Sequence, residues 1–183
     1  MLNDPFQAEP PYERHPHPAS RDGDELLTEC ELGRGRSGGP GGQHRNKVQT
    51  LVVLTHRATE ISAQAGERRS AIDNKRVALA RLRLALATQH RTGVIEGDAR
   101  SALWRSRVDK NGKISISERH HDFAAMLAEA MDHVWAAGLE PRKAAIRLCC
   151  TPSQLLKLLA KHPPALGELN RARTERGKHA LQT

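Results

Sequence analysis

The chain has 183 residues, of which 38% are hydrophobic and only 3% aromatic, so it can form one domain or two small ones with aliphatic cores. Its net charge of +8 favours an anionic partner such as a nucleic acid. No apolar run approaches the length of a membrane span, and the N-terminus lacks the apolar segment of a signal peptide. Three cysteines are too few for a disulfide framework, so we expect a reducing, cytoplasmic environment.

The basic charge is concentrated in one part of the chain. Residues 1–32 carry two basic and eight acidic groups, residues 33–91 carry twelve and three, and residues 92–183 carry fifteen and ten. Residues 1–23 are rich in Pro, Asp, Glu and His and have almost nothing to bury, so we expect a disordered N-terminal arm. The pair His15 and His17 has no third ligand spaced near it and does not predict a metal site.

Strand patterns flank a glycine-rich segment. Glu25 to Leu32 alternates as a half-buried strand does, Val48 to Thr55 is a β-branched run typical of a central strand, and Glu60 to Gln64 predicts a short return strand. Between the first two lies Arg36 to Lys47, which holds four glycines and a proline around Gln43. Such a segment cannot hold a helix or a central strand, but it can turn several backbone N–H groups toward one point. That concavity suits a phosphate or a developing oxyanion.

A long helix is predicted after these strands. Ser70 to Asp73 has the form of a capping box, with Asp where Glu or Gln is usual, and the helix should continue to about Thr88. Lys75 falls within the apolar stripe and Arg76 borders it, so the helix has either a basic flank facing RNA or an ordinary solvated face. The stripe itself consists of Ile72, Leu79, Leu82 and Leu86.

Residues 91–118 are predicted to be a polar linker with a short strand. The turn at Asp109 to Gly112 resembles the start of a calcium loop, but residue 120 is His where that loop needs a bidentate Glu, so we reject calcium. His120 and His121 are adjacent and cannot easily share one metal. We therefore predict no metal.

Residues 119–183 are predicted to form an α-helical module. Helical spacing begins at Asp122 and ends at Gly138, Pro141 begins a second helix, and Cys149 to Pro152 break it before a third. This pattern resembles a helix-turn-helix unit. A last helix follows Pro163, and it ends in a basic tail that we expect to be exposed, with Arg171, Arg173, Arg176 and Lys178.

Three blocks resemble, in the same order, class I peptide-chain release factors and the stand-alone hydrolases that rescue ribosomes. Ser37 to Lys47 is similar to the catalytic GGQ loop of that family, Thr55-His56-x-x-Thr59-x-Ile61 to the strand and turn after it, and Arg69-Ser70-x-x-x-Asn74-Lys75 to the start of its long helix. The resemblance implies an α+β fold in residues 24–90, with a small sheet and one long helix bearing the GGQ loop. The α-helical module would follow it.

The resemblance also implies a chemistry. The family hydrolyses the ester that joins a nascent peptide to tRNA in the peptidyl-transferase centre. By resemblance Gly41 and Gly42 fix the loop, the main-chain N–H of Gln43 stabilises the oxyanion or the departing ribose oxygen, and the Gln43 side chain shapes the space for water. No cofactor is implied. The expected RNA-binding residues are Arg34, Arg36, His44, Arg45, Asn46, Lys47, Arg68, Arg69, Lys75 and Arg76.

Some positions depart from the family pattern. Arg45 stands where a small apolar residue is common, Ala58 and Glu60 stand where Pro and Gly are usual in the turn, and Ala71 replaces a frequent Gln. None of these touches the Gly-Gly-Gln triplet, so they put the RNA contacts in doubt and not the activity. His44 is a candidate general base by position, but we expect it to bind RNA or hold the loop.

A codon-specific release factor needs a separate domain to read the stop codon, and residues 1–23 are too short and polar to be one. We therefore expect a monomeric, codon-independent peptidyl-tRNA hydrolase that rescues stalled ribosomes or large subunits. Its partners would be peptidyl-tRNA and the rRNA of the large-subunit peptidyl-transferase centre, with no membrane. The alternative is a non-enzymatic ribosome- or RNA-binding factor that uses the loop only for docking.

Overall fold

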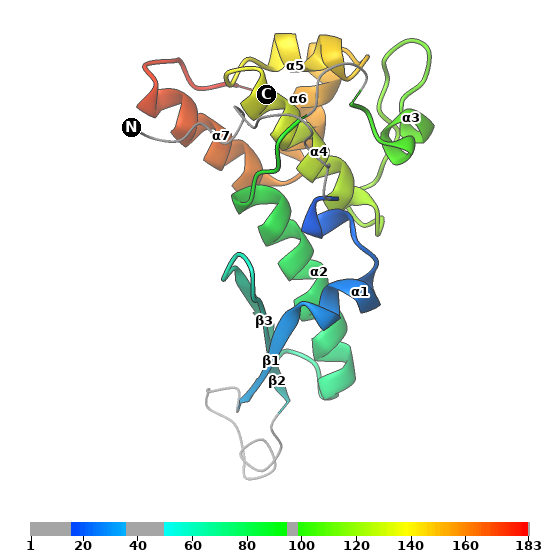
Figure 1. Cartoon of the computed structure of the whole chain (residues 1–183), viewed down its shortest axis with the longest axis vertical. Coiled ribbons are helices and arrows are strands. Elements are labelled where there is room, and N and C mark those ends of the chain that lie inside the picture. The colour runs from blue at the N-terminus through cyan, green and yellow to red at the C-terminus, as the bar shows by residue number, and fades with distance from the viewer. Residues whose placement is uncertain (1–15, 36–49, 95–98, 183) are drawn as a thin grey trace. The chain divides into compact units, whose positions relative to one another are not determined.

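The computed structural model describes residues 16–35, 50–94 and 99–182 (Figure 1). The chain divides into two compact units. The hairpin unit is Arg21–Leu86, and the helical unit combines Met1–Ser20 with Ala87–Thr183. In chain order the described elements are η1 (Pro18–Ser20), α1 (Gly23–Thr28), β1 (Cys30–Gly35), β2 (Leu51–His56), β3 (Ser62–Ala65), α2 (Ala71–Gln89), α3 (Ala102–Arg107), α4 (Phe123–Ala136), α5 (Pro141–Arg147), α6 (Pro152–Ala160) and α7 (Pro163–Glu175). The α+β fold class is confirmed.

The hairpin unit contains an antiparallel sheet in the order β1-β2-β3, beside which α2 lies (Figure 1). The central strand β2 alternates between half-buried and buried residues, because successive side chains of a strand point to opposite faces. Its buried residues are Val52, Leu54 and His56. The β-branched run therefore predicted the central strand correctly, and the return strand is displaced slightly from Glu60–Gln64 to Ser62–Ala65.

The strand predicted at Glu25–Leu32 is wrong in its first half. Residues Gly23–Thr28 form α1, and β1 begins only at Cys30. The helix starts because the side chain of Asp22 accepts a hydrogen bond from the N–H of Asp24 at 2.9 Å. Leu26 and Cys30 are the buried residues of this stretch. Residues four apart share a face in a strand as well as in a helix, so the apolar pattern of this stretch does not distinguish the two.

Helix α2 matches the predicted range, but its buried stripe is rotated. Ile72 is 68% exposed, so its place in the apolar stripe was wrong. The residues of α2 within the hairpin unit that are buried are four apart, namely Asn74, Ala78, Leu82 and Leu86. A polar residue therefore begins the buried face. Ser70 caps the helix, because its hydroxyl accepts hydrogen bonds from the N–H groups of Ile72 and Asp73 at 3.2 and 3.4 Å.

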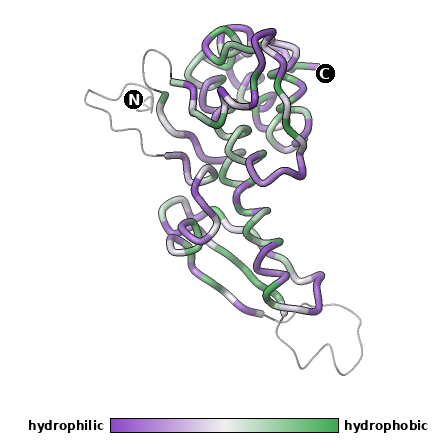
Figure 2. Tube along the Cα trace, turned by 90° about the vertical axis from the view of Figure 1, so that its right-hand side faces the viewer, coloured by the Kyte–Doolittle hydropathy of each residue, from purple (hydrophilic) through white to green (hydrophobic). Residues whose placement is uncertain are grey.

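The helical unit is built on α4. Every residue of α4 from Phe123 to Val134 is buried, and η1, α5 and α6 pack against it. Two buried carboxylates of α4 tie down irregular backbone. Glu129 accepts a hydrogen bond from the N–H of Ser101 at 2.7 Å, and Asp132 accepts one from the N–H of Thr92 at 3.1 Å. Figure 2 shows hydrophobic and hydrophilic residues alternating along the coils of this unit, as expected for surface helices with one buried face, whereas α4 is buried on all sides.

The segment expected as a linker contains structure. Helix α3 lies within residues 91–118, and the indole of Trp104 is fully buried and donates a hydrogen bond to the carbonyl of Leu148 at 2.9 Å. The expected short strand is an isolated bridge between Val108 and Ile114. No helix in the described ranges is both long enough and apolar enough to cross a bilayer.

The basic tail is exposed only in part, since Arg171 and Arg176 are exposed and the other two cations are not. Arg173 is buried, where it donates hydrogen bonds to the backbone carbonyls of Leu139 and His179. Lys178 forms an ion pair with Glu140. Arg171 is exposed but bridges Glu168 and Glu175 at 2.6 and 2.7 Å. Three of the four tail cations are therefore bound by backbone carbonyls and carboxylates of the module itself.

Candidate functional site

The β1–β2 hairpin carries the glycine-rich segment. The two strands pair from Cys30 opposite His56 to Gly35 opposite Leu51, so residues 36–50 connect their ends. The predicted catalytic residues Gly41, Gly42 and Gln43 lie outside the described residues, as do the predicted RNA-binding residues Arg36, His44, Arg45, Asn46 and Lys47. The structure therefore shows the two strands that carry the segment and the contacts that hold these strands. Both ends of its hairpin are held by side chains.

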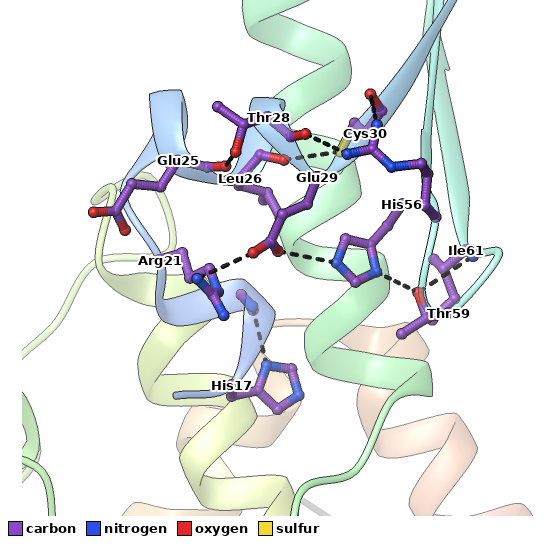
Figure 3. A network of polar contacts seen from close by, with 12 residues as sticks. His17, Arg21, Glu25, Leu26, Thr28, Glu29, Cys30, His56, Thr59 and Ile61 are labelled. Carbon is purple, nitrogen blue, oxygen red and sulfur yellow. Dashed lines mark hydrogen bonds and ion pairs between the residues drawn. The ribbon is translucent and has the colours of Figure 1, made fainter. Parts of the chain in front are cut away.

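A chain of hydrogen bonds closes the hairpin end away from the segment (Figure 3). His56 is only 3% exposed, and its Nε2 lies 3.3 Å from Glu29 Oε2 while its Nδ1 lies 2.9 Å from Thr59 Oγ1. A carboxylate can only accept, so Nε2 donates to Glu29 and Nδ1 accepts from the Thr59 hydroxyl. The same hydroxyl oxygen accepts from the N–H of Ile61 at 3.4 Å, and Arg21 pairs with the other oxygen of Glu29 at 3.0 Å. The side chains of the Thr55–Ile61 block thus fix the conformation of the β2–β3 turn.

Arg57 reinforces the same end. Its guanidinium donates to the carbonyls of Cys30 at 3.0 Å and of Thr28, at the junction of α1 and β1. Glu60, in the turn, has a φ of 59°, which is a left-handed conformation that favours glycine. This is the position where the family pattern has Gly, so Glu60 occupies a conformation that glycine would adopt at lower cost.

Asn74 holds the hairpin end that leads to the segment. Its Nδ2 donates to the carbonyl of Thr50 at 2.6 Å and to that of Arg68 at 2.9 Å, and its Oδ1 accepts from the N–H of Arg68 at 2.9 Å. Thr50 is the first described residue after the glycine-rich segment. The fully buried amide therefore joins the outgoing arm of the segment to the loop before α2. We call these three hydrogen bonds the Asn74 clamp.

The sequence pattern predicts RNA contacts for the neighbours Lys75 and Arg76 and assigns no role to Asn74. The signal that could have found it is an amide at a core position. Asn74 precedes Ala78 and Leu82 at four-residue spacing, and a buried amide needs fixed partners.

The described members of the predicted RNA-binding set lie around this clamped end. Arg34 is exposed on β1, one residue before the strand ends. Arg68 and Arg69 are exposed in the loop before α2, and Arg76 is exposed with a weak ion pair to Asp73 at 3.7 Å. Lys75 is partly exposed. The start of α2 and the end of β1 lie at the same end of the hairpin unit (Figure 1). These cations form a basic rim around the base of the glycine-rich segment.

Two of the three cysteines, Cys30 and Cys150, are not activated nucleophiles. Burial raises the pKa of the Cys30 thiol, and the Cys30 Sγ–H donates to the carbonyl of Leu26 at 3.1 Å. Burial, with a smaller contribution from Cys149, raises the pKa of Cys150 to about 11. Both groups are therefore thiols at neutral pH, whereas nucleophilic cysteines need a lowered pKa.

One group of described residues has metal-ligand chemistry. Ligand atoms of His120, His121 and Asp122 lie within 4.8 Å of one another. Adjacent histidines can thus approach one another more closely than the sequence led us to expect. Arg107, however, donates to the Asp122 carboxylate at 3.0 Å, and the two imidazoles stack at 4.3 Å between centroids. Because a guanidinium already neutralises the only carboxylate of the group, we assign no metal to it.

Comparison with known proteins places these features in a family context. Residues 27–125 match the RF-1 domain family. The chain is 39% identical over 79 residues to peptide chain release factor PrfB1, chloroplastic, of Arabidopsis thaliana, a match that covers 40% of this chain and 17% of the relative. It is 27% identical over 125 residues to peptide chain release factor 1 of Symbiobacterium thermophilum, covering 61% of this chain and 35% of the relative. The chain thus spans little more than a third of these relatives at most, and no solved structure shows significant similarity to it.

Proposed function

Because the chain belongs to the RF-1 domain family, we propose that it hydrolyses the ester between a nascent peptide and tRNA on the ribosome. The observation that carries the proposal is the family match over residues 27–125, which include the Gly41-Gly42-Gln43 triplet and the hairpin that mounts it. The anchoring at both hairpin ends supports it, since a catalytic loop has to be presented from a rigid support.

In the proposed reaction water attacks the ester carbonyl carbon, and the bond to the ribose oxygen breaks. The peptide leaves as a carboxylic acid, and the ribose oxygen takes a proton to become a hydroxyl. The negative charge that develops on oxygen is stabilised by the main-chain N–H of Gln43, while Gly41 and Gly42 give the loop its conformational freedom. Cys30 and Cys150, as thiols, take no part.

The basic rim is proposed to bind rRNA or tRNA beside the ester. Arg34, Arg68, Arg69, Lys75 and Arg76 would contact phosphates, as would the cations of residues 36–47. Phosphate contacts position a protein without reading sequence, which suits an enzyme whose chemistry takes place at one fixed point of the ribosome.

We propose a division of labour along the chain. Residues 24–90 would carry the chemistry, and residues 119–183, against which residues 91–118 pack through Trp104, would recognise the stalled particle. The helical module has a possible helix-turn-helix and lacks a glycine-rich loop in its sequence. We further propose that the reaction rescues stalled ribosomes or large subunits without reading a codon.

Cytoplasm is the proposed location. Cys30, Cys149 and Cys150 are free, as expected in a reducing compartment. One relative is named as a chloroplastic protein, so an organelle is the competing location.

The test measures release of labelled peptide from ribosomes stalled with an empty A site. Ribosomes on an mRNA with a stop codon in the A site are assayed in parallel. Equal release on both templates supports a codon-independent hydrolase. Release only with a stop codon supports a codon-specific factor. If the protein binds these ribosomes and releases no peptide, the non-enzymatic alternative holds.

A further inference from the structure

We propose that helices α5 and α6 form a second RNA-binding surface, which holds the phosphate backbone of double-helical RNA. Its proposed contact residues, called here the basic face, are Arg142, Lys143, Arg147 and Lys157. This site is separate from the glycine-rich segment. Only the choice of RNA as the polyanion depends on the proposed function; the phosphate-binding mode is argued from the helices themselves.

The two helices have one apolar and one basic side. In α5, Ala144 and Ala145 are buried, while Arg142, Lys143 and Arg147 are exposed. In α6 the buried residues are Leu155, Leu158 and Leu159, and Lys157 is exposed between them. Because residues four apart share a helix face, Lys143 and Arg147 lie together on α5. The packing of the helices thus leaves their cations directed to solvent.

These cations have no acidic counterparts on their own helices. Residues 141–162 contain five Lys or Arg residues and no Asp or Glu. Among the described residues, no hydrogen bond or ion pair involves the side chains of the basic face, whereas Arg171 and Lys178 of the same unit are paired with carboxylates. The fifth cation, Lys161, donates to the carbonyl of Ile116. Glu140, just before α5, attracts Lys143 but is already paired with Lys178. The basic face therefore keeps an excess of positive charge, and a bound polyanion would relieve its repulsion.

Three contacts fix the turn between α5 and α6. The Trp104 indole donates to the carbonyl of Leu148 at 2.9 Å, the N–H of Thr151 donates to the carbonyl of Gly112 at 3.2 Å, and the N–H of Ile114 donates to the side-chain oxygen of Gln154 at 3.3 Å. The angle between the helices is therefore set by segments outside them. A rigid support for surface cations lowers the entropy lost on binding.

The turn at residues 109–113 adds two more cations. Lys110 and Lys113 are exposed, and Gly112 between them packs against the α5–α6 turn, where an added Cβ would lie 3.1 Å from Cys150 Cα. Asp109, exposed in the same turn, keeps its negative charge while its carboxylate accepts hydrogen bonds from the N–H groups of Asn111 and Lys113 at 2.8 and 2.9 Å, so the turn adds a net charge of +1 from Lys110, Lys113 and Asp109. The positive region thus extends beyond α5 and α6.

The composition of the surface favours phosphate contacts over base recognition. Gln154, the amide side chain in the first turn of α6, is already bound to the Ile114 backbone. The polar groups left exposed near it are the four cations of the basic face and the hydroxyls of Thr151 and Ser153, beside one large exposed apolar residue, Ile146. Lysine and arginine contact phosphates, and they read bases only where a groove admits them. Double-helical RNA presents two rows of phosphates and a deep, narrow major groove that side chains cannot read, which matches such a surface.

The proposal is tested with the full chain and a labelled RNA hairpin of about 20 base pairs, longer than the ~16 that a double-stranded-RNA domain spans. Fluorescence anisotropy gives the affinity at salt concentrations from about 50 to 200 mM. The test variant is Arg142→Gln/Arg147→Gln. The matched control is Arg119→Gln/Arg176→Gln, which removes the same charge at two exposed positions of the same unit. Circular dichroism and thermal unfolding verify that both variants fold.

If Arg142 and Arg147 each neutralise one phosphate, the wild-type affinity should fall about 12-fold more over this salt range than that of the test variant, using the duplex-DNA coefficient of ~0.9 per contact. The control variant should keep the wild-type salt dependence. Equal effects of the two double substitutions would overturn the proposal, as would absence of wild-type binding at the lowest salt. Tighter binding to a DNA duplex of the same length would overturn the choice of RNA. Peptide release is not measured, so this result and the proposed activity can fail independently.

Discussion

The Asn74 clamp gives the most informative prediction about how the glycine-rich segment is held. Asn74→Ala removes three neutral hydrogen bonds, at 2.6, 2.9 and 2.9 Å, from a side chain that is fully buried. Each such bond contributes about 0.5–1.5 kcal/mol net, which gives roughly 1.5–4.5 kcal/mol for three. Arg68 is exposed, so water can replace its two bonds, and we expect a loss near the lower end of the range, about 2 kcal/mol.

The assay has to report on the hairpin unit alone. Both tryptophans, Trp104 and Trp135, lie in the helical unit, so their fluorescence serves as an internal control. Hydrogen exchange of the β1–β2 amides, followed by mass spectrometry, reports the hairpin unit. A loss of about 2 kcal/mol corresponds to roughly 30-fold faster exchange in the hairpin, while the tryptophan signal should keep its unfolding midpoint.

A matched substitution at an exposed amide, Asn111→Ala, should leave hairpin exchange unchanged, because that side chain belongs to the other unit. Asn74→Asp should weaken the clamp at least as much as Ala, since a carboxylate would face the carbonyls of Thr50 and Arg68. Hairpin exchange in Asn74→Ala within twofold of wild type would refute the clamp.

Three further outcomes test other parts of the structure. Glu60→Gly should stabilise the hairpin unit by about 0.5–1 kcal/mol, because it removes the cost of about 1–2 kcal/mol of a left-handed backbone at a non-glycine residue and adds the entropy cost of glycine. A hairpin unit that is less stable in urea unfolding would contradict this. Gly112→Ala should destabilise the helical unit by about 1–3 kcal/mol, because its φ is 74° and a Cβ would lie 3.1 Å from Cys150 Cα; an unchanged tryptophan unfolding midpoint would be the contrary result. Burial lowers the pKa of His162, so the unfolded chain binds a proton on this imidazole more readily than the folded chain does. The stability of the helical unit should therefore fall as pH drops through the ordinary His value near 6.5. His162→Gln should flatten this dependence of stability on pH, and an identical dependence would exclude His162 as its source.

Local patterns predicted much of the fold because they record burial directly. The β-branched run before Thr55 gave the central strand, and the break predicted at Cys149 to Pro152 falls between α5 and α6, where Thr151 accepts a hydrogen bond from the N–H of Gln154 at 3.2 Å. The prediction failed where two periods fit the same residues. Leu26 and Cys30 fit a helix as well as the alternation fits a strand, and the Asp22 cap decides between them.

Long-range polar contacts could not be predicted in this way. Whether Arg173 is a surface cation or a buried donor depends on the carbonyl of Leu139, which lies far from it in the sequence. The clamp has the same character, since Asn74 meets Thr50 only after the sheet and α2 have packed. Residues 36–49, which carry the predicted chemistry, lie outside the described part of the chain, so their roles stay predictions.

The most direct test of the proposed activity compares wild type with Gly42→Ala in peptide release from ribosomes that lack a stop codon. Ribosome binding is measured in parallel, so that a loss of release is separated from a loss of docking. We expect wild type to release peptide and Gly42→Ala to release it about 10²-fold or more slowly with similar binding, as for the loss of one oxyanion donor. Equal rates for the two proteins, or no release by either, would contradict the proposal that the glycine-rich segment hydrolyses peptidyl-tRNA.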